Sequence, residues 1–191
     1  PSILPALTPR LPVPVIYNCG GYESVETLRE LEGLIDIYLP DYKYRSSRLS
    51  EKYSHAPDYP EVAAKAIAEM VRQTGKASFF QEDEDGLIKR GTIVRHLTLP
   101  GCMEDSKSVL QYLHETYGED IYISIMNQYT PVRKFVEFKE LNRKVTKREY
   151  EKVLDAAVDM GIQNGFIQEG ETASESFIPD FDYEGVEKNT P

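Results

Sequence analysis

The chain has 191 residues and a mass of 21.8 kDa, which suits a single domain. Its 22 Lys and Arg residues against 32 Asp and Glu residues give a net charge of −10, which argues against non-specific nucleic-acid binding and a polybasic membrane contact. No stretch approaches the length of apolar sequence that a transmembrane helix needs, and the first residues lack the pattern of a signal peptide.

Apolar runs rich in β-branched residues alternate with segments of helical periodicity. In chain order we predict a strand at 13–17, a helix at 24–33, a strand at 35–39, helices at 47–53 and 59–75, a strand at 92–99, a helix at 106–118, a strand at 121–126, a helix at 146–161 and a strand at 165–168. The helix ends carry capping signals, of which the clearest is the capping box formed by Thr146 and Glu149. Near-continuous apolar strands separated by helices predict an α/β fold with a parallel sheet.

Three segments stand outside this alternation. Residues 1–7 have the pattern of an amphipathic helix already under way, and residues 78–90 are predicted to form a solvated acidic loop. Residues 169–191 are predicted to be an extended tail that packs aromatic side chains on the domain.

Polar side chains follow successive predicted strands, at the edge where open α/β sheets and β/α barrels bind ligands. The first strand leads into Asn18 and a Gly-Gly pair, but no G-x-G-x-x-G pattern or P-loop follows. This favours a barrel, although a full eight-stranded barrel takes about 250 residues. We therefore expect an incomplete, TIM-like β/α barrel of four to five parallel strands with outer helices, lacking its preceding sequence.

The single candidate residues have competing interpretations. Arg95 lies inside an apolar strand, so it either forms a structural ion pair or holds a ligand carboxylate. Lys43 is either a cation for an anionic ligand or a solvated lysine. His96 alternates with Arg95 and is predicted to be a packed, hydrogen-bonded histidine. Asp36 and Asp41 are predicted to face opposite sides of their strand, which weakens an acid/base pair.

The two cysteines, Cys19 and Cys102, restrict the chemistry further. Without a CxxC pair, zinc ribbons and thioredoxin-type sites are excluded, and two thiols cannot hold an iron–sulfur cluster alone. The spacing of the three histidines does not favour a metal site. We predict two half-buried thiols in a protein of the reducing cytoplasm.

The strand-end motifs resemble the radical S-adenosylmethionine superfamily, in the branch related to pyruvate formate-lyase activating enzyme. The motifs that carry this resemblance are residues 16–22 (IYNCGGY), 36–44 (DIYLPDYKY), 93–101 (IVRHLTLPG), 126–131 (MNQYTP), 141–143 (LNR), 164–168 (NGFIQ) and 177–182 (FIPDFD). The resemblance implies a partial barrel of about six strands and reductive cleavage of S-adenosylmethionine by a [4Fe–4S] cluster. The resulting 5′-deoxyadenosyl radical then removes a hydrogen atom, for example from a glycyl-radical enzyme.

Motif matching implies that S-adenosylmethionine contacts Asn18, Asp41, Lys43, Arg95, and Gln128 or Tyr129. Of these, Arg95 is expected near the carboxylate of the ligand, and Gln128 or Tyr129 near its adenosyl part. The implied partners are a glycyl-radical enzyme or another protein substrate, and an electron donor such as flavodoxin or ferredoxin.

The sequence lacks two motifs of the family. The family's Cys-x-x-x-Cys-x-x-Cys loop, which binds the cluster, has no counterpart here, and neither does its Gly-Gly-Glu-type segment. We therefore expect residues 1–191 to form one partial-barrel domain that is the C-terminal part of a longer enzyme. This part is expected to be inactive alone. The alternatives are a cluster-free binding or regulatory barrel and an unrelated barrel hydrolase that uses Asp41 and Lys43.

Overall fold

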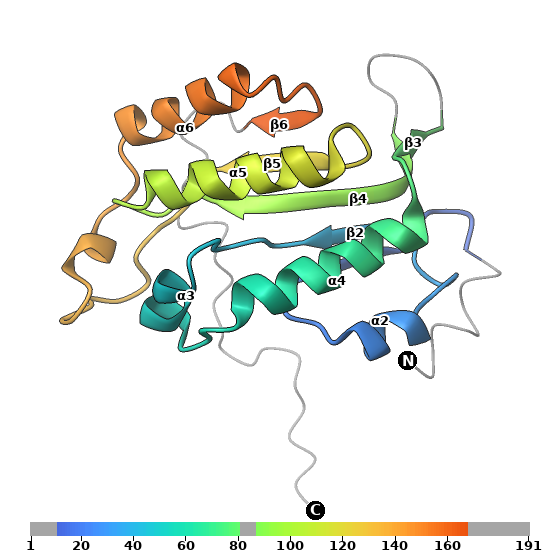
Figure 1. The fold of residues 1–191 in the computed structure, drawn as a ribbon, viewed down its shortest axis with the longest axis horizontal. Coiled ribbons are helices and arrows are strands. Elements are labelled where there is room, and N and C mark those ends of the chain that lie inside the picture. Colours follow the sequence, from blue (N-terminus) through green and yellow to red (C-terminus); the bar gives the residue numbers. More distant parts are fainter. Residues whose placement is uncertain (1–10, 81–86, 168–191) are drawn as a thin grey trace, which may run out of the picture.

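The computed structural model describes residues 11–80 and 87–167, and the elements alternate as the sequence predicts (Figure 1). They are β1 (Ile16–Cys19), α2 (Val25–Glu30), β2 (Ile37–Pro40), α3 (Ser47–Ser54), α4 (Tyr59–Thr74), β3 (Ser78–Phe79), β4 (Ile88–Leu97), α5 (Met103–Tyr117), β5 (Tyr122–Met126), the 3-10 helix η2 (Lys139–Asn142), α6 (Lys147–Asp159) and β6 (Gly165–Ile167). The helix expected at 1–7 and the tail expected at 169–191 lie outside the described residues.

The strands form one sheet in the order β1-β2-β4-β5-β6, and every neighbouring pair along this path is parallel. This confirms the predicted α/β fold with a parallel sheet. The loop expected at 78–90 is wrong in part, because β3 pairs antiparallel with the start of β4. β3 is only two residues long. In the sequence, an acidic run separates the two apolar residues that pair, Phe79 and Ile88, so their pairing is not apparent.

The helix ends follow the capping signals. Thr146 and Glu149 form the predicted capping box at the start of α6, and Ser24 and Ser46 cap α2 and α3 through their hydroxyl oxygens. Pro60 lies in the first turn of α4, where its missing N–H costs no hydrogen bond. Local chemistry therefore sets these boundaries, as the sequence predicts.

Four boundaries differ from the prediction by three residues or more: the starts of β1, β4 and α5 and the end of α2, with β4 beginning at Ile88 instead of residue 92. β1 runs from Ile16 to Cys19 rather than over 13–17, and Pro14 within the predicted range has no N–H to donate to a neighbouring strand. α5 begins at Met103, three residues before the expected Ser106, and the N–H of Ser106 donates to the carbonyl of Cys102 within the first turn.

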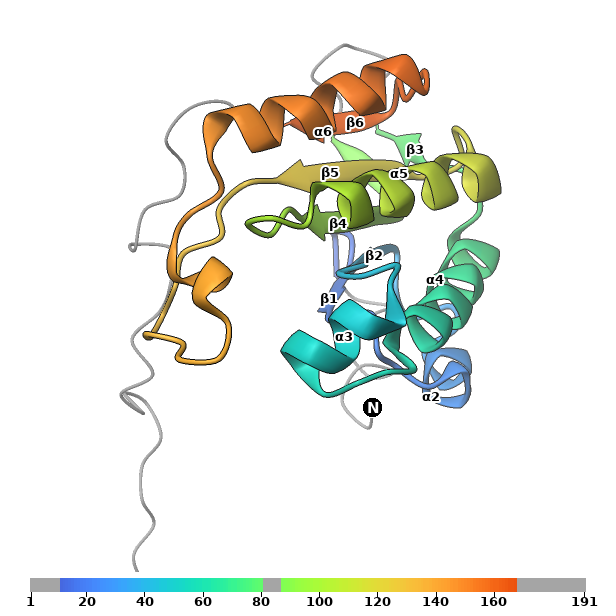
Figure 2. The same cartoon turned by 60° about the vertical axis from the view of Figure 1, so that its left-hand side comes forward.

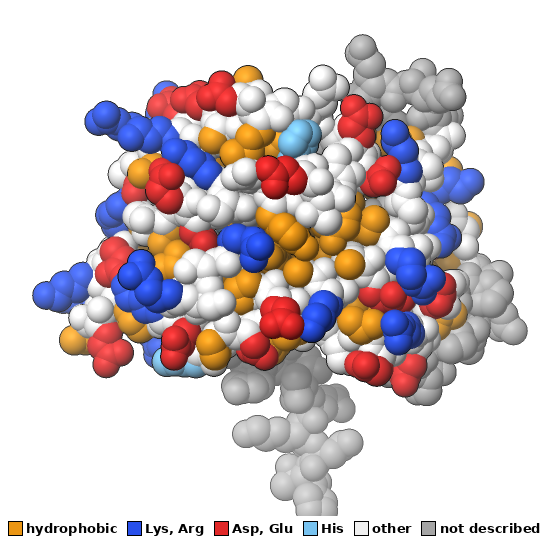
Figure 3. Space-filling model, viewed as in Figure 1, with side chains coloured by type: hydrophobic (Ala, Val, Ile, Leu, Met, Phe, Trp, Pro, Cys, Tyr) orange, Lys and Arg blue, Asp and Glu red, His pale blue; other side chains and the backbone are white. Residues whose placement is uncertain are grey.

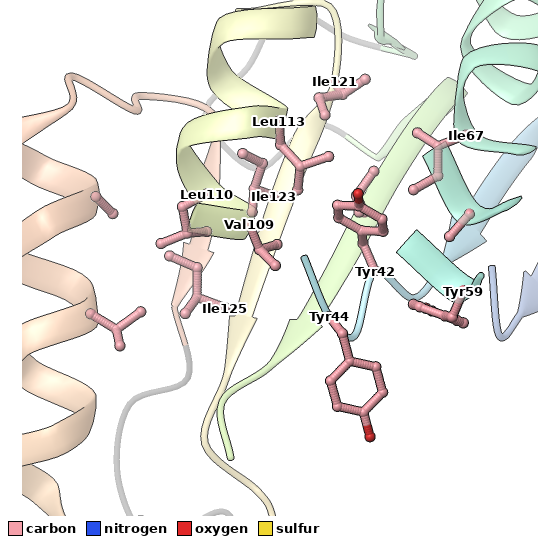
Figure 4. Close-up of a cluster of buried hydrophobic side chains, with 14 of the residues drawn as sticks. Tyr42, Tyr44, Tyr59, Ile67, Val109, Leu110, Leu113, Ile121, Ile123 and Ile125 are labelled. Carbon is pink, nitrogen blue, oxygen red and sulfur yellow. The ribbon is translucent and has the colours of Figure 1, made fainter. Parts of the chain in front are cut away.

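The core lies between the sheet and the helices on one of its faces (Figures 1 and 2). Buried side chains from β4 and β5 meet those of α4, α5 and α6, as the close-up in Figure 4 shows. Ile121, just before β5, and Ile123 and Ile125 within it are at most 1% exposed. A smaller cluster joins α2 and α4 to Tyr38 of β2. Burial of these apolar surfaces is the main stabilising term of the fold.

The opposite face of the sheet carries the other alternate residues and is much less buried. Ile16 on β1 is 57% exposed, and Phe166 on β6 is 48% exposed. Arg95 alternates with the buried Val94 and His96 and therefore faces this side. An arc of parallel strands with helices on one face and a charged residue on the other is consistent with a partial barrel. Among the described residues, no helix has the length and apolar composition needed to cross a membrane.

Candidate functional site

Three charged side chains predicted from the strand ends meet at the carboxyl edge of β2 and β4. Asp41 forms a parallel bridge with Arg95, and its Oδ1 lies 2.6 Å from Arg95 Nη2. The Nζ of Lys43 lies 3.6 Å from Asp41 Oδ2. The exposed fractions of the side chains are 20% for Asp41, 25% for Arg95 and 44% for Lys43. The three charges therefore sum to +1 at a position that is open to solvent on one side.

The ion pair leaves hydrogen-bonding capacity unused. Arg95 Nε is buried and has no hydrogen-bond partner among the described residues. Asp41 Oδ1 is also buried, and its close contact with Arg95 Nη2 does not have the alignment of a hydrogen bond. An unpaired buried polar atom typically costs about 1–3 kcal/mol. The unpaired Nε of Arg95 therefore marks a place where a polar ligand with an acceptor oxygen would gain binding energy.

A glycine loop lies against this charged group. Gly21, with φ +79°, is buried, and a Cβ there would stand 2.0 Å from the carbonyl oxygen of Asp41. A Cβ on Gly20 would meet Lys43 Nζ at 3.8 Å. The N–H of Asp41 donates to the carbonyl of Cys19 at 3.0 Å. The loop after β1 therefore approaches the residues after β2 as closely as the backbone allows, which only glycine permits at position 21.

Tyr59, at the start of α4, ties these two loops together. Its hydroxyl accepts a hydrogen bond from the N–H of Lys43 and lies 3.0 Å from the carbonyl oxygens of Gly20 and Asp41, to one of which it donates. The side chain is 4% exposed, and burial raises the pKa of its hydroxyl. The sequence does not predict this role, because Tyr59 belongs to an outer helix and no strand-end pattern includes it.

Cys19 and Glu23 flank the glycine pair in the sequence. Burial and the nearby Glu23 carboxylate raise the pKa of the Cys19 thiol to about 12. The thiol is therefore protonated at neutral pH and is not a nucleophile. Glu23 Oε2 is buried without a hydrogen-bond partner among the described residues. The prediction of half-buried thiols is confirmed, since both cysteines are intermediate in exposure and burial also raises the pKa of Cys102.

The other predicted ligand residues lie at the same edge but are not shown in contact with the charged group. Asn18 is exposed on β1 and faces the same side of the sheet as Arg95, in register with Leu39. Gln128 follows β5, and its Nε2 lies 3.7 Å from Met126 Sδ. Tyr129 donates its hydroxyl to the carbonyl of Leu141 at 2.9 Å.

His96 points into the core, as predicted. Its Nδ1 lies 2.9 Å from the carbonyl oxygen of Tyr42, and the residue is 1% exposed. Burial lowers the pKa of its imidazole to about 4. His96 therefore stays neutral at physiological pH and packs between sheet and helices. Asp36, just before β2, accepts a hydrogen bond from Val15 N, whereas Asp41, just after β2, pairs with Arg95.

A cleft of about 510 Å³ opens between α3, the turn after β4 and η2. Its lining residues are Ser46, Arg48, Leu49, Lys52, Tyr53, Pro100, Gly101, Cys102, Glu104, Asp105, Ser108 and Glu140. Most of its charged groups are engaged: Asp105 accepts from two backbone N–H groups, and Glu140 accepts from Lys52 and Tyr53. None of the ligand residues predicted from the sequence lines this cleft.

The described residues hold no cluster of three or more His, Cys, Asp or Glu side chains that could bind a metal ion. The fold and the site thus define a parallel α/β protein with a cationic group at the carboxyl edge of its sheet.

Comparison with known proteins adds one relative. An uncharacterized protein of Methanocaldococcus jannaschii is 25% identical over 146 residues, which cover 76% of this chain and 38% of the relative. The matched part therefore spans about two-fifths of the relative's length. No family model matches the chain. No solved structure matches it either.

Proposed function

We propose that this chain is part of a radical S-adenosylmethionine enzyme of the branch related to pyruvate formate-lyase activating enzyme, and that it holds the amino-acid end of S-adenosylmethionine. The observation that carries the proposal is the meeting of Asp41, Lys43 and Arg95 beside a glycine loop at the strand ends. The resemblance of the strand-end motifs supports the same assignment. The parallel sheet with helices on one face suits a partial barrel of this superfamily.

The polar atoms left unpaired at the site match an amino acid. The methionyl end of S-adenosylmethionine carries a carboxylate and an ammonium group. Arg95 Nε and Lys43 Nζ supply donors for the carboxylate, and the Asp41 carboxylate, which also pairs with both cations, supplies acceptor lone pairs for the ammonium group. Binding would therefore give the buried Arg95 Nε its missing partner. Asn18, Gln128 and Tyr129 at the same edge are proposed to face the rest of the ligand.

The iron–sulfur cluster does not fit these residues. The chain has two cysteines, one after β1 and one at the start of α5, and both have thiols whose pKa burial raises. A cluster needs three or four thiolates held together. Radical cleavage of S-adenosylmethionine, a glycyl-radical enzyme as substrate and flavodoxin or ferredoxin as donor therefore belong to the proposed cytoplasmic parent. The isolated chain is expected to bind the ligand without turning it over.

The second candidate is a cluster-free binding or regulatory module. The shortage of thiolates in this chain favours it, and the same charged group would then hold its ligand. A hydrolase that uses Asp41 and Lys43 is disfavoured, because Asp41 is engaged with two cations and is not placed as a free base.

Equilibrium dialysis with radiolabelled S-adenosylmethionine tests the proposal on the 191-residue chain. Loss of a charge-assisted hydrogen bond costs about 1.5–3 kcal/mol, so Lys43→Ala and Arg95→Ala should each weaken binding about 10- to 100-fold. Lys65→Ala removes an exposed ion-paired lysine on α4 and is the matched control.

Two competing ligands separate the parts of the proposal. Methionine should compete and adenosine should not, if the charged group holds the amino-acid end. Undiminished affinity in both site variants would remove Lys43 and Arg95 from the site. Absence of any binding at millimolar ligand would refute the assignment of the ligand to this chain.

A further inference from the structure

The segment between β5 and α6 forms a lobe beyond the carboxyl edge of the sheet (Figure 2). We call residues 127–146 the basic lobe. It carries five Lys and Arg residues against two Glu residues, a local charge of +3 in a chain whose net charge is −10. At physiological ionic strength, charges act mainly within about 8 Å. A surface that approaches the lobe therefore interacts mainly with the local positive charge of the lobe and not with the negative net charge of the whole chain.

Hydrogen bonds within the basic lobe and to α3 define its conformation. The side chain of Asn142 accepts from Phe135 N and donates to Phe135 O, both at 2.7 Å, which closes the turn between them. Leu141 is buried, and Tyr129 donates its hydroxyl to the Leu141 carbonyl at 2.9 Å. Glu140 accepts from Lys52 of α3. The first three bonds close turns within the lobe, and the last joins it to α3.

The tip of the basic lobe exposes two valines among cations. Val132 is 71% exposed and Val136 is 81% exposed, although hydrogen bonds hold this turn in place. Arg133 and Lys134 lie between them and are exposed. Lys134 forms no ion pair with any described residue. Figure 3 shows Lys and Arg side chains projecting at the left-hand end of the molecule, over η2 and the start of α6.

We infer that the basic lobe docks a protein partner that presents an acidic surface with a shallow apolar recess for Val132 and Val136. Carboxylates of the partner would pair with Arg133 and Lys134, which gives fast, salt-dependent association. The two valines would lose their exposed area on docking, which supplies affinity that charge alone does not. The inference goes beyond the proposed function and does not depend on it, since it stands on the lobe alone.

The composition of the tip favours a protein over other polyanions. Insertion into a membrane surface typically uses large apolar and aromatic side chains, but both phenylalanine rings of the lobe are engaged, and its one tyrosine, Tyr129, donates to Leu141. Arg133 covers the ring of Phe135 at 5.3 Å, and Phe138 packs edge-to-face on Tyr53 at 5.4 Å.

Selection of a phage-displayed library of random 12-residue peptides against the immobilised full chain tests this inference. We expect the enriched peptides to combine Asp or Glu with apolar residues. Synthetic copies should bind at least 10-fold more weakly to Val132→Ser/Val136→Ser and to Arg133→Glu/Lys134→Glu. The matched controls are Val158→Ser, which changes a valine 72% exposed on α6, and Lys65→Glu, which reverses a charge 65% exposed on α4.

The opposite results overturn the inference. They are a library that yields no binder, enriched peptides without acidic residues, or equal affinity for the lobe variants and the two controls. Binding of the chain to vesicles with 30% phosphatidylserine, or to single-stranded RNA, that is lost in Arg133→Glu/Lys134→Glu would assign the lobe to those ligands instead. All four changed positions are exposed, so circular dichroism spectra and unfolding midpoints should match those of the unchanged chain.

Discussion

The two glycines at positions 21 and 33 offer a direct test of the contact between the site loops. Both have φ +79°, a backbone conformation that side chains with a Cβ rarely adopt. A Cβ on Gly33 would meet nothing within 4 Å, whereas a Cβ on Gly21 would stand 2.0 Å from the Asp41 carbonyl oxygen. Gly21→Ala and Gly33→Ala therefore introduce the same backbone strain, and only the first adds a clash.

The expected costs follow from these two terms. The left-handed conformation costs an alanine about 1–2 kcal/mol relative to glycine. Forcing an atom into an occupied position adds about 1–3 kcal/mol or more, because the backbone must move. Gly33→Ala should therefore lower the free energy of unfolding by about 1–2 kcal/mol. Gly21→Ala should exceed that loss by at least about 1 kcal/mol.

Urea unfolding followed by circular dichroism measures both losses on the same scale. Equal losses of stability would show that the loop after β1 does not press on Asp41, and the geometry of the proposed site would lose its support. The same variants also report on function. Movement of the Asp41 backbone displaces its carboxylate, so Gly21→Ala should weaken ligand binding while Gly33→Ala leaves it unchanged.

Three further predictions concern buried polar groups. Tyr59→Phe leaves the Lys43 N–H without its acceptor and should lower the free energy of unfolding by about 1–3 kcal/mol. Tyr22→Phe removes a hydrogen bond from an exposed tyrosine to Asp58 and should cost less than about 1 kcal/mol. His96 binds a proton more readily in the unfolded chain, because burial lowers its folded pKa to about 4. Titration of His96 should therefore lower the free energy of unfolding by about 2 kcal/mol between pH 7 and 5. Urea titrations of His96→Gln should lack this pH-dependent loss, and those of His114→Gln, the control, should keep it. Glu69 has a pKa lowered to about 2 by hydrogen bonds from Arg72 and Gln73, so its contribution is present above about pH 4.3 and lost as the pH falls toward 2. Unfolding midpoints of Glu69→Gln should fall less steeply across that window, and an unchanged slope would contradict the assignment.

The fold was predictable where local chemistry and periodicity agree. The capping box at Thr146 and Glu149 marks α6, and the proline and glycine at the ends of α4 mark its limits. β3 was not predictable, because a two-residue strand carries too little pattern and exists only through pairing with β4. The start of β1 was misplaced because strand pairing, not the apolar run, decides where a strand begins.

The candidate site was predictable to the extent that topology decides it. Parallel strands bring their carboxyl ends to one edge, so Asp41, Lys43 and Arg95 meet although they are far apart in the sequence. Tyr59 was not predictable, because its hydroxyl reaches the loops from an outer helix. The hydrogen bond from Tyr129 to the Leu141 carbonyl was not predictable either, because it depends on the fold of the basic lobe.

The sequence leaves two interpretations of Arg95, a structural ion pair or a ligand contact, and the structure shows that they are compatible. Asp41 takes one end of the guanidinium group through Nη2, while Nε stays buried and unpaired. A purely structural pair would use the donors of the guanidinium group more fully, because two parallel N–H···O bonds to one carboxylate hold an arginine best. Asp41 instead fixes the orientation of Arg95 and leaves one donor free. We therefore expect stability to depend on the pair, and ligand affinity to depend on the donor that the pair leaves unused.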